Sequence, residues 1–134
     1  MRAIVSDTHA LIWYLTRSAK LSADARKAFR QTESAGDSIY VPSIVIVELR
    51  YLVERQRVSE EDYLTVLSSV KNPKSALLIA PLDLEVAEVL SQIPHHLAPD
   101  MPDRIIAATA LSFGAPLVTS DSRLNELTNV KVVW

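Results

Sequence analysis

Short apolar runs alternate with amphipathic segments along the whole chain, and polar or turn-forming residues separate them. The apolar runs are rich in β-branched residues and predict strands at residues 3–6, 38–41, 77–80, 116–121 and 131–134. Segments with apolar residues at helical spacing predict helices at residues 10–17, 22–33, 44–57, 59–70, 84–93 and 105–113, with a short helix after residue 121. Near-continuous apolar strands that alternate with helices predict an α/β fold, in which helices cover both faces of a mainly parallel sheet.

Residues at the predicted helix ends support these boundaries. Ser22, Ser43 and Ser59 each precede a helix, and a serine side chain can accept a hydrogen bond from the first helical turn. An acid three residues after Ser59 gives the spacing of a capping box, with aspartate in place of glutamate. Pro102 suits the start of the helix that Gly114 ends.

The composition predicts one compact domain over residues 1–134. Of the 134 residues, 49% are hydrophobic, 22% are charged and none is cysteine, so the core forms without disulfides or zinc–thiolate sites. No apolar stretch approaches the roughly 20 residues that a membrane span requires, and the N-terminus lacks the layout of a signal peptide. We therefore expect no membrane association and a cytoplasmic location.

Charge and glycine content narrow the functions that the chain can have. The formal net charge is -2, so no overall positive field draws the protein to nucleic acid, and any such contact must be local. Only two glycines are present, whereas the glycine-rich loops that bind nucleotide phosphates need two or three at fixed offsets. Nucleotide-cofactor functions are therefore disfavoured.

Acids stand where an open α/β sheet places its functional crevice, beyond the carboxyl ends of the strands, and the predicted fold aims three of four candidate acids at one end of the sheet. Asp7 ends the first predicted strand, Asp121 ends the fourth, and Asp103 opens the helix before the fourth. Glu48 lies one turn into the helix after the second strand, among apolar neighbours, where a partly buried glutamate needs a partner. Taken singly, the aspartates also fit helix caps or first-turn positions, and Glu48 fits an exposed helix position.

Clustered carboxylates repel one another unless a cation neutralises them, and a divalent metal is the simplest such cation. Oxygen ligands suit Mg²⁺ or Mn²⁺, whereas His9, His95 and His96 lack the paired spacing of a zinc motif. A metal held by acids, with open water positions, is the usual equipment for phosphodiester hydrolysis, so a metal-dependent nuclease is the leading hypothesis. Thr8 and Thr119 stand beside two of the acids and can hydrogen-bond the carboxylates, or can serve only as strand and cap residues.

Several segments together resemble the PIN-domain family, and within it the VapC-type toxins of toxin–antitoxin pairs. The resemblance rests on Ile-Val-Ser-Asp-Thr-His-Ala-Leu-Ile-Trp at residues 4–13, on residues 42–49, on Asp-Arg-Ile-Ile-Ala-Ala-Thr-Ala at residues 103–110, and on Leu-Val-Thr-Ser-Asp at residues 117–121. The order and spacing of these segments agree with the family along essentially the whole chain.

The resemblance implies a PIN-like three-layer sandwich built on a mainly parallel sheet of about five strands. It implies that Asp7, Glu48, Asp103 and Asp121 form an acidic site that binds Mg²⁺ or Mn²⁺. It further implies an endoribonuclease that hydrolyses RNA phosphodiester bonds, forms a homodimer and is neutralised by a cognate VapB-like antitoxin. Asp100 also matches an acid that is common in the family, and we expect it to cap a helix or to support the metal ligands.

Other interpretations stay open. A PIN module that binds RNA or protein without catalysis fits the same fold, although none of the four acids is missing. A Mg²⁺-binding signalling receiver domain needs a phosphoacceptor aspartate after a middle strand and a lysine after a late one. The predicted strand at residues 77–80 ends in Ala-Pro, and Lys131 begins the last strand instead, which disfavours the receiver domain.

Basic and aromatic residues give weaker signals. Arg50, Arg55 and Arg57 follow Glu48 and are candidates for contacts to RNA phosphates, although a solvated helix face or ion pairs explain them better. Arg104 is expected to make a structural ion pair. Aromatic residues are 6% of the chain and do not alternate with basic ones, so Trp13 and Trp134 are assigned to the core or a dimer interface rather than to base stacking.

Overall fold

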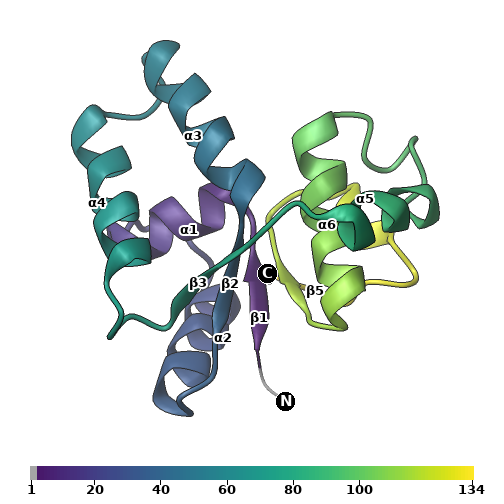
Figure 1. The fold of residues 1–134 in the computed structure, drawn as a ribbon. Coiled ribbons are helices and arrows are strands. Elements are labelled where there is room, and N and C mark those ends of the chain that lie inside the picture. The colour runs from purple at the N-terminus through teal and green to yellow at the C-terminus, as the bar shows by residue number, and fades with distance from the viewer. Residues whose placement is uncertain (1–2) are drawn as a thin grey trace.

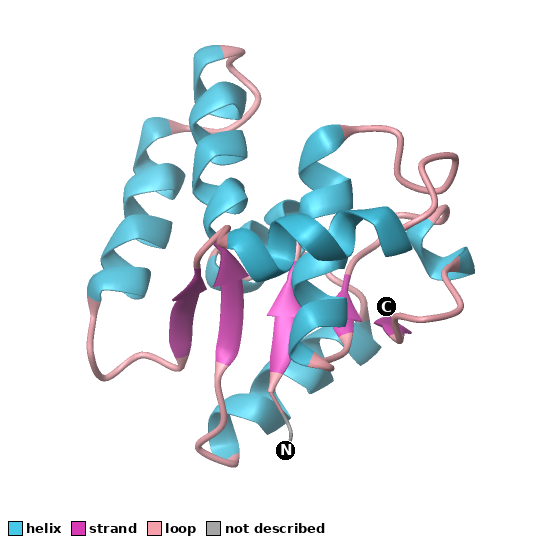
Figure 2. Cartoon of the chain, turned by 45° about the vertical axis from the view of Figure 1, so that its right-hand side comes forward, coloured by secondary structure: helices cyan, strands magenta, loops and turns pink. Residues whose placement is uncertain are grey.

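The computed structural model describes residues 3–134, which form an α/β fold around one five-stranded sheet. The strands are β1 (Ile4–Ser6), β2 (Ile39–Pro42), β3 (Leu77–Ala80), β4 (Leu117–Val118) and β5 (Val132–Val133). They lie in the order β3-β2-β1-β4-β5 and all pairs are parallel, so the arrows in Figure 2 point the same way. The expected parallel sheet of about five strands is confirmed.

Helices cover both faces of the sheet and give the expected three layers (Figures 1 and 2). They are α1 (Thr8–Leu15), α2 (Ala23–Ser34), α3 (Ser43–Glu54), α4 (Glu60–Lys71), α5 (Leu84–Val89) and α6 (Met101–Phe113), with short 3₁₀ turns at Leu90–Gln92 and Leu124–Glu126. The pair α5 and α6 packs on one face, where α6 contacts β1 and β2, while α2 contacts the same strands from the other. Within residues 3–134, no helix combines the length and the apolar character that crossing a membrane requires.

The core lies between the central strands and the helices packed on them. Val5 in β1, Ile39 in β2 and Leu117 in β4 are fully buried, as are Phe29 in α2 and Ile106 in α6. The middle of α6, residues 105–110, is buried throughout and is rich in alanine, so this helix approaches the sheet closely. Such burial explains why the sequence of α6 is apolar around most of its circumference.

Several predicted boundaries are wrong by a few residues. The helix α6 begins at Met101 rather than 105, and α1 begins at Thr8, directly after Asp7. The helix α3 ends at Glu54 rather than 57, because Gln56 takes a positive φ of 60°. Strands β4 and β5 have two paired residues each, fewer than the apolar runs suggested.

The caps follow the prediction at three of the four positions. Ser22 and Ser59 accept hydrogen bonds from the first turns of α2 and α4, and Gly114 ends α6 in the left-handed conformation, with φ 62°. Ser43 does not cap α3: its hydroxyl accepts a hydrogen bond from the backbone N–H of Leu82 at 3.2 Å, and Pro42 takes the N-cap position without a side-chain bond. Ser43 thus links α3 to the segment after β3.

The strand order reverses at the centre of the sheet. The chain steps from β1 to β2 and β3 on one side and then returns to place β4 and β5 on the other side of β1. Ligand sites in open parallel sheets form at such a reversal, outside the carboxyl ends of the strands. In this chain Asp7 follows β1 there, and residues 119–121 follow β4.

Candidate functional site

A pocket of about 270 Å³ lies at this reversal point, and all four acids predicted from the sequence line it. Its lining residues are Asp7, Thr8, His9, Glu48, Asp103, Ser120 and Asp121. They come from the start of α1, the middle of α3, the first turn of α6 and the segment after β4. The helices α3 and α6 flank the site and extend past the strand ends (Figure 1). We call this cavity the acidic pocket.

Asp7 is fixed by both of its carboxylate oxygens. Its Oδ1 accepts a hydrogen bond from the backbone N–H of Ala10 at 2.8 Å, which caps α1, and its Oδ2 accepts one from the Thr119 hydroxyl. The same hydroxyl accepts a hydrogen bond from the backbone N–H of Asp121 at 3.1 Å. Thr119 therefore ties the end of β1 to the end of β4. Burial raises the pKa of Asp7 to about 6, although the bonds from Thr119 and Ala10 oppose the shift.

Glu48 is partly buried and has the partner that its apolar surroundings call for. The hydroxyl of Thr8, at the start of α1, donates a hydrogen bond to Oε1 of Glu48. Thr8 and Thr119 are both buried, and each hydroxyl donates to one carboxylate and helps to hold it in place. No hydrogen bond to the other Glu48 oxygen is found in the described part of the chain, and Glu48 lines the pocket.

Asp103 differs from these two acids because no hydrogen bond to its side chain is found among residues 3–134. It sits in the first turn of α6, where the helix N-terminus favours a negative charge. Burial first, and then the negative charges of Glu48, Asp121, Asp7 and Asp100, nevertheless raise its pKa to about 7. Asp103 thus faces other carboxylates with no cation to offset them.

Asp121 and Asp100 complete the acidic surroundings. The Oδ1 atom of Asp121 accepts hydrogen bonds from the backbone N–H groups of Arg123 at 2.8 Å and Leu124 at 3.3 Å, which fixes the loop after β4. Asp100 takes the N-cap position of α6, but its side chain makes no capping hydrogen bond. It acts on the site through its charge, as one of the groups that raise the pKa of Asp103.

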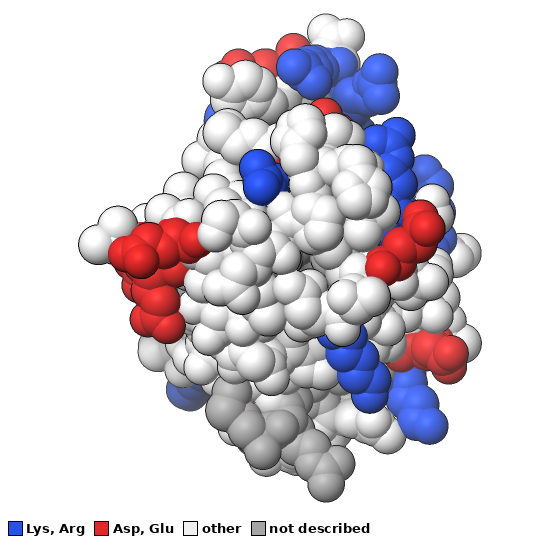
Figure 3. All heavy atoms as spheres, turned by 90° about the vertical axis from the view of Figure 1, so that its right-hand side faces the viewer, with Lys and Arg blue, Asp and Glu red and all other residues white. Residues whose placement is uncertain are grey.

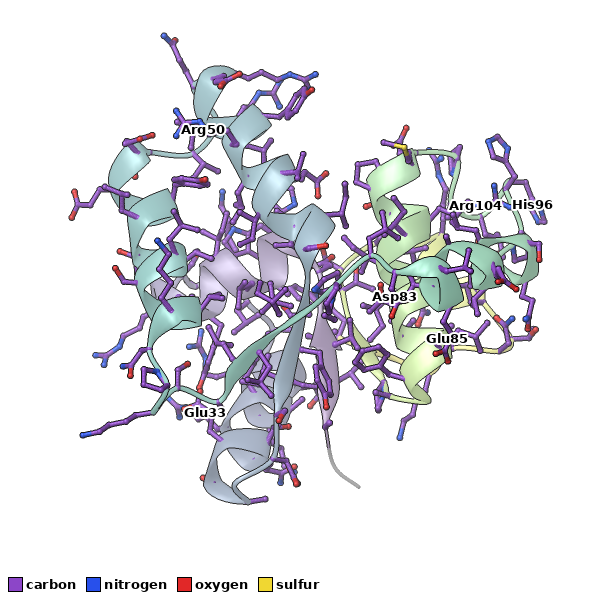
Figure 4. All side chains as sticks on the ribbon, in the orientation of Figure 1. Glu33, Arg50, Asp83, Glu85, His96 and Arg104 are labelled. Atoms are coloured by element: carbon purple, nitrogen blue, oxygen red, sulfur yellow. The ribbon has the colours of Figure 1, made fainter. Side chains whose placement is uncertain are left out.

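The nearby arginines do not neutralise the acidic pocket. Arg50 pairs with Glu60 at 2.9 Å and with Glu54 at 3.4 Å, on the α4 side of α3 (Figure 4). Its charge is therefore used in ion pairs, the alternative to phosphate contacts that the sequence favoured. Arg104 points to the other side of α6, where its Nε donates to the Ile93 carbonyl at 3.1 Å (Figure 4). The ion pair expected of Arg104 is therefore replaced by a structural hydrogen bond.

A hard divalent cation fits the chemistry of this site. The donors are carboxylates with hydroxyls beside them, which suit Mg²⁺ or Mn²⁺ and not zinc. The raised pKa values of Asp7 and Asp103 reflect burial and unopposed negative charge, which a cation relieves. Within residues 3–134, no three acidic or histidine side chains are already arranged to hold an ion. Binding therefore requires some side-chain movement, which Asp103 can make because its carboxylate accepts no hydrogen bond from these residues.

Two lining residues, His9 and Ser120, are not among the site residues predicted from the sequence. The His9 ring packs against Trp13 with centroids 5.5 Å apart, and Trp13 in turn packs against Trp134 at 5.8 Å. Both His9 and Ser120 are exposed and directly follow a residue that is held in place. Their position next to Thr8 and Thr119 is the signal that could have identified them.

Charge on the outer surface is distributed in separate groups. On the face shown in Figure 3, Lys and Arg side chains lie mainly towards one edge, acidic side chains form separate groups, and uncharged surface fills the centre. This face therefore carries no continuous basic surface, in agreement with the small negative net charge.

Relatives of known name match nearly the whole chain. Ribonuclease VapC22 of Mycobacterium tuberculosis is 29% identical over 124 residues, which cover 92% of this chain and 91% of that protein. A chain in DNA-bound VapBC from Salmonella typhimurium is 23% identical, with a TM-score of 0.70, and covers 98% of this chain and 97% of its own. A chain in VapBC2 from Rickettsia felis, bound to a promoter DNA fragment, also has a TM-score of 0.70. It is 17% identical, and the match covers 97% of this chain and 96% of that one.

These structures share the fold described above, and so does a chain of FitAcB from Neisseria gonorrhoeae. That chain is 23% identical, with a TM-score of 0.63, and the match covers 96% of this chain and 95% of that one. The model of the PIN domain family matches residues 4–130, which include β1, the acidic pocket and the whole of α6. The chain therefore belongs to the PIN domain family.

Proposed function

We propose that this protein is a Mg²⁺- or Mn²⁺-dependent endoribonuclease and the toxin of a toxin–antitoxin pair, with residues 1–134 as one nuclease domain. The observation that carries the proposal is the meeting of Asp7, Glu48, Asp103 and Asp121 in one pocket at the reversal point of the sheet. The relative named as a ribonuclease supports RNA as the substrate, because its match spans nearly the whole length of both chains.

In this proposal Asp7, Asp103 and Asp121 hold the metal directly, and Glu48 completes the site as a ligand or through a bound water. Mg²⁺ or Mn²⁺, when bound, acts as a Lewis acid towards the scissile phosphate and activates water for attack. Thr119 and Thr8 keep the carboxylates of Asp7 and Glu48 in fixed orientations. Two of the four carboxylates, those of Asp7 and Glu48, are thus held in place before RNA arrives.

Proton release accompanies ion binding in this site. The raised pKa values of Asp7 and Asp103, about 6 and about 7, mean that these groups are partly protonated between pH 6 and pH 7 when no cation is bound. Metal ligands must be deprotonated, so we expect ion affinity to increase as the pH rises through 6 and 7. Activity should follow the same direction over this range.

We propose two kinds of protein contact. Relatives with this fold are found in VapBC complexes, which supports a VapB-like antitoxin as the partner that blocks the site. The apolar side chains exposed at Leu78, Leu82 and Leu84 supply a surface suited to a homodimer.

The RNA substrate is most accessible as a single strand or loop, whose backbone can enter a small pocket.

Cleavage of total cellular RNA by the purified, antitoxin-free protein tests the proposal. The reaction is run with Mn²⁺, with Mg²⁺ and with EDTA, for the wild type and for the Asp7→Asn and Asp103→Asn variants. We expect cleavage only with metal, and a loss of at least about a hundredfold in both variants, because even residues beside the ligands typically cost ten- to a hundredfold. Asp62→Asn is the matched control, because Asp62 lies on α4, outside the acidic pocket.

The outcomes separate the alternatives. Cleavage that survives both substitutions in folded protein would place the active site elsewhere or reveal a contaminant. Metal binding by the wild type without cleavage of any RNA would favour a PIN module that binds RNA or protein without catalysis. Circular dichroism and Tm measurements on each variant show whether the fold is retained.

A further inference from the structure

A second cavity opens beside the acidic pocket and shares two of its walls. It has a volume of about 500 Å³ and is lined by Ile44, Val47, Glu48, Tyr51, Arg55, Asp100, Met101, Pro102 and Asp103. Glu48 and Asp103 line both cavities, so the two adjoin. We call it the side groove. Its volume is large enough for a ligand of nucleotide size.

The floor of the side groove is one stripe of α3. Residues 44, 47, 48, 51 and 55 are spaced by three or four positions, so a helix places them along one side. Met101 and Pro102, at the start of α6, form the opposite wall. Large apolar side chains are exposed along both sides of the groove: Val47 at 49%, Tyr51 at 57% and Met101 at 66%. An exposed apolar patch that borders a candidate active site indicates ligand contact.

Tyr51 and Arg55 form a platform within this groove. The guanidinium of Arg55 lies 6.0 Å from the centre of the Tyr51 ring. Among residues 3–134, the ion pairs of α3 are made by Arg50, with Glu54 and Glu60, and Arg55 has none. The two arginines therefore differ: Arg50 is neutralised, whereas Arg55 offers an unpaired positive charge beside an exposed aromatic ring.

We infer that the side groove binds the nucleotide next to the cleaved bond of the RNA, an inference that rests on the proposed function. The base stacks on Tyr51 opposite Met101, and Arg55 contacts a phosphate beyond it. An aromatic face combined with a cation suits a single-stranded nucleotide, whose base and phosphate it contacts together. Asp100 repels phosphate at the near end of the groove, which places the flanking phosphate at the Arg55 end.

Binding of RNA without cleavage tests this inference directly. The probe is a fluorescein-labelled 12-nucleotide single-stranded RNA of random sequence, titrated with the full chain in Ca²⁺ and followed by fluorescence anisotropy. For Tyr51→Ala we expect Kd to rise by about five- to a hundredfold, the range for loss of one stacked base. Tyr51→Phe should stay within about twofold of the wild type, because the ring is retained.

Matched arginine variants distinguish a specific phosphate contact by Arg55 from the general effect of losing one positive charge. Arg55→Ala should weaken binding and reduce the slope of log Kd against log salt by about 1, as expected for one lost phosphate contact. Arg50→Ala removes the same charge from the same helix and should leave RNA binding unchanged. Cleavage kinetics with Mn²⁺ provide a second measurement, in which Tyr51→Ala should raise KM more than it lowers kcat. Tyr51 is exposed, so its truncation should leave Tm near the wild-type value.

Each contrary result has a distinct meaning. If the wild type cleaves RNA while Tyr51→Ala and Arg55→Ala keep its Kd and KM, the groove does not hold RNA and the nuclease function stands. If these two variants instead lose only their complex with a co-expressed antitoxin, the groove belongs to the protein partner and the inference is wrong. If the wild type neither binds nor cleaves RNA, the proposed function fails, and this inference fails with it.

Discussion

The junctions β1–α1 and β3–α5 are built from the same local parts but have different consequences. In each, an aspartate after a parallel strand caps the following helix. Asp7 accepts a hydrogen bond from the N–H of Ala10 at 2.8 Å, and Asp83 accepts one from the N–H of Val86 at 3.0 Å. Judged by local geometry alone, both residues are ordinary N-caps.

The surroundings of the two aspartates separate them. Asp7 follows the central strand, where it meets Thr119 and shares a pocket with three other acids. Asp83 follows an edge strand, is exposed and lies outside the acidic pocket (Figure 4). The comparison teaches that a capping role and a site role can coincide in one residue. What distinguishes them is the position of the strand in the sheet.

The largest effect should come from exchanging the carboxylate at each junction for an amide. An asparagine keeps the capping oxygen, so Asp7→Asn and Asp83→Asn should both retain their helices. We expect Asp7→Asn to lose at least about a hundredfold in RNA cleavage and Asp83→Asn to match the wild type. Cleavage rates at saturating Mn²⁺ measure the difference. Equal rates for the two variants would show that Asp7 is only a cap.

A smaller loss should follow from removing the partner that only Asp7 has. Thr119→Val keeps the shape of the side chain but deletes the hydroxyl that holds Asp7 and accepts from Asp121. We expect Mn²⁺ affinity and cleavage to fall by about ten- to a hundredfold. Thr119→Ser, which restores the hydroxyl, should recover most of both. A Mn²⁺ titration of Thr119→Val that coincides with the wild type would refute the positioning role.

Stability in the absence of metal should depend on pH, because the carboxylates of the acidic pocket are buried and lie close to one another. The folded-state pKa values of Asp7 and Asp103, about 6 and about 7, lie above the ordinary value of 3.8. Between these values the folded chain binds more protons than the unfolded chain. The contribution of these two groups to the free energy of unfolding is therefore highest below pH 4. It should fall as the pH rises to about 7, by about 1.4 kcal/mol at most for each unit of difference between the folded and the ordinary pKa.

Urea unfolding in EDTA at several pH values measures this loss. The Asp103→Asn variant should flatten the slope and be more stable than the wild type at pH 8, because it removes one of the opposed charges. Asp83→Asn should keep the wild-type slope. Saturating Mn²⁺ should offset the loss in the wild type. A wild-type free energy of unfolding that rises between pH 5 and pH 7 in EDTA would contradict the raised pKa values.

The sequence predicted the fold class and the four pocket acids, because both depend on local signals. Apolar runs mark the strands, and Asp7 and Asp121 come at predicted strand ends, which lie at one edge of a parallel sheet. Glu48 is marked by its apolar neighbours, and Asp103 by its place at the start of a helix. The resemblance to the PIN family added the number of strands, about five, which the structure confirms. That these acids act as metal ligands stays a prediction.

Contacts between distant segments could not be predicted in the same way. The sequence predicted that Thr119 can hydrogen-bond a carboxylate, but not that this carboxylate is that of Asp7, 112 residues away. The bond that the Leu82 N–H donates to the Ser43 hydroxyl spans 39 residues. Ser43 has the local features of a cap, but the strand order brings the Leu82 N–H to its hydroxyl, which takes it away from that role. The side groove was also missed, because Tyr51 and Met101 meet only when α3 and α6 flank the site.

The smallest expected effect comes from removing the Asp83 side chain, which caps α5 and has no role in the proposed active site. Asp83→Ala removes the side-chain acceptor for Val86 and should cost about 1 kcal/mol of stability, whereas Asp83→Asn should cost only a few tenths. Thermal unfolding and urea titrations at pH 8 measure both values, and RNA cleavage should be unchanged in either variant. If Asp83→Ala lowered cleavage without lowering stability, the β3–α5 junction would contribute to the active site. The contrast with Asp7 would then no longer follow from the position of the strand in the sheet.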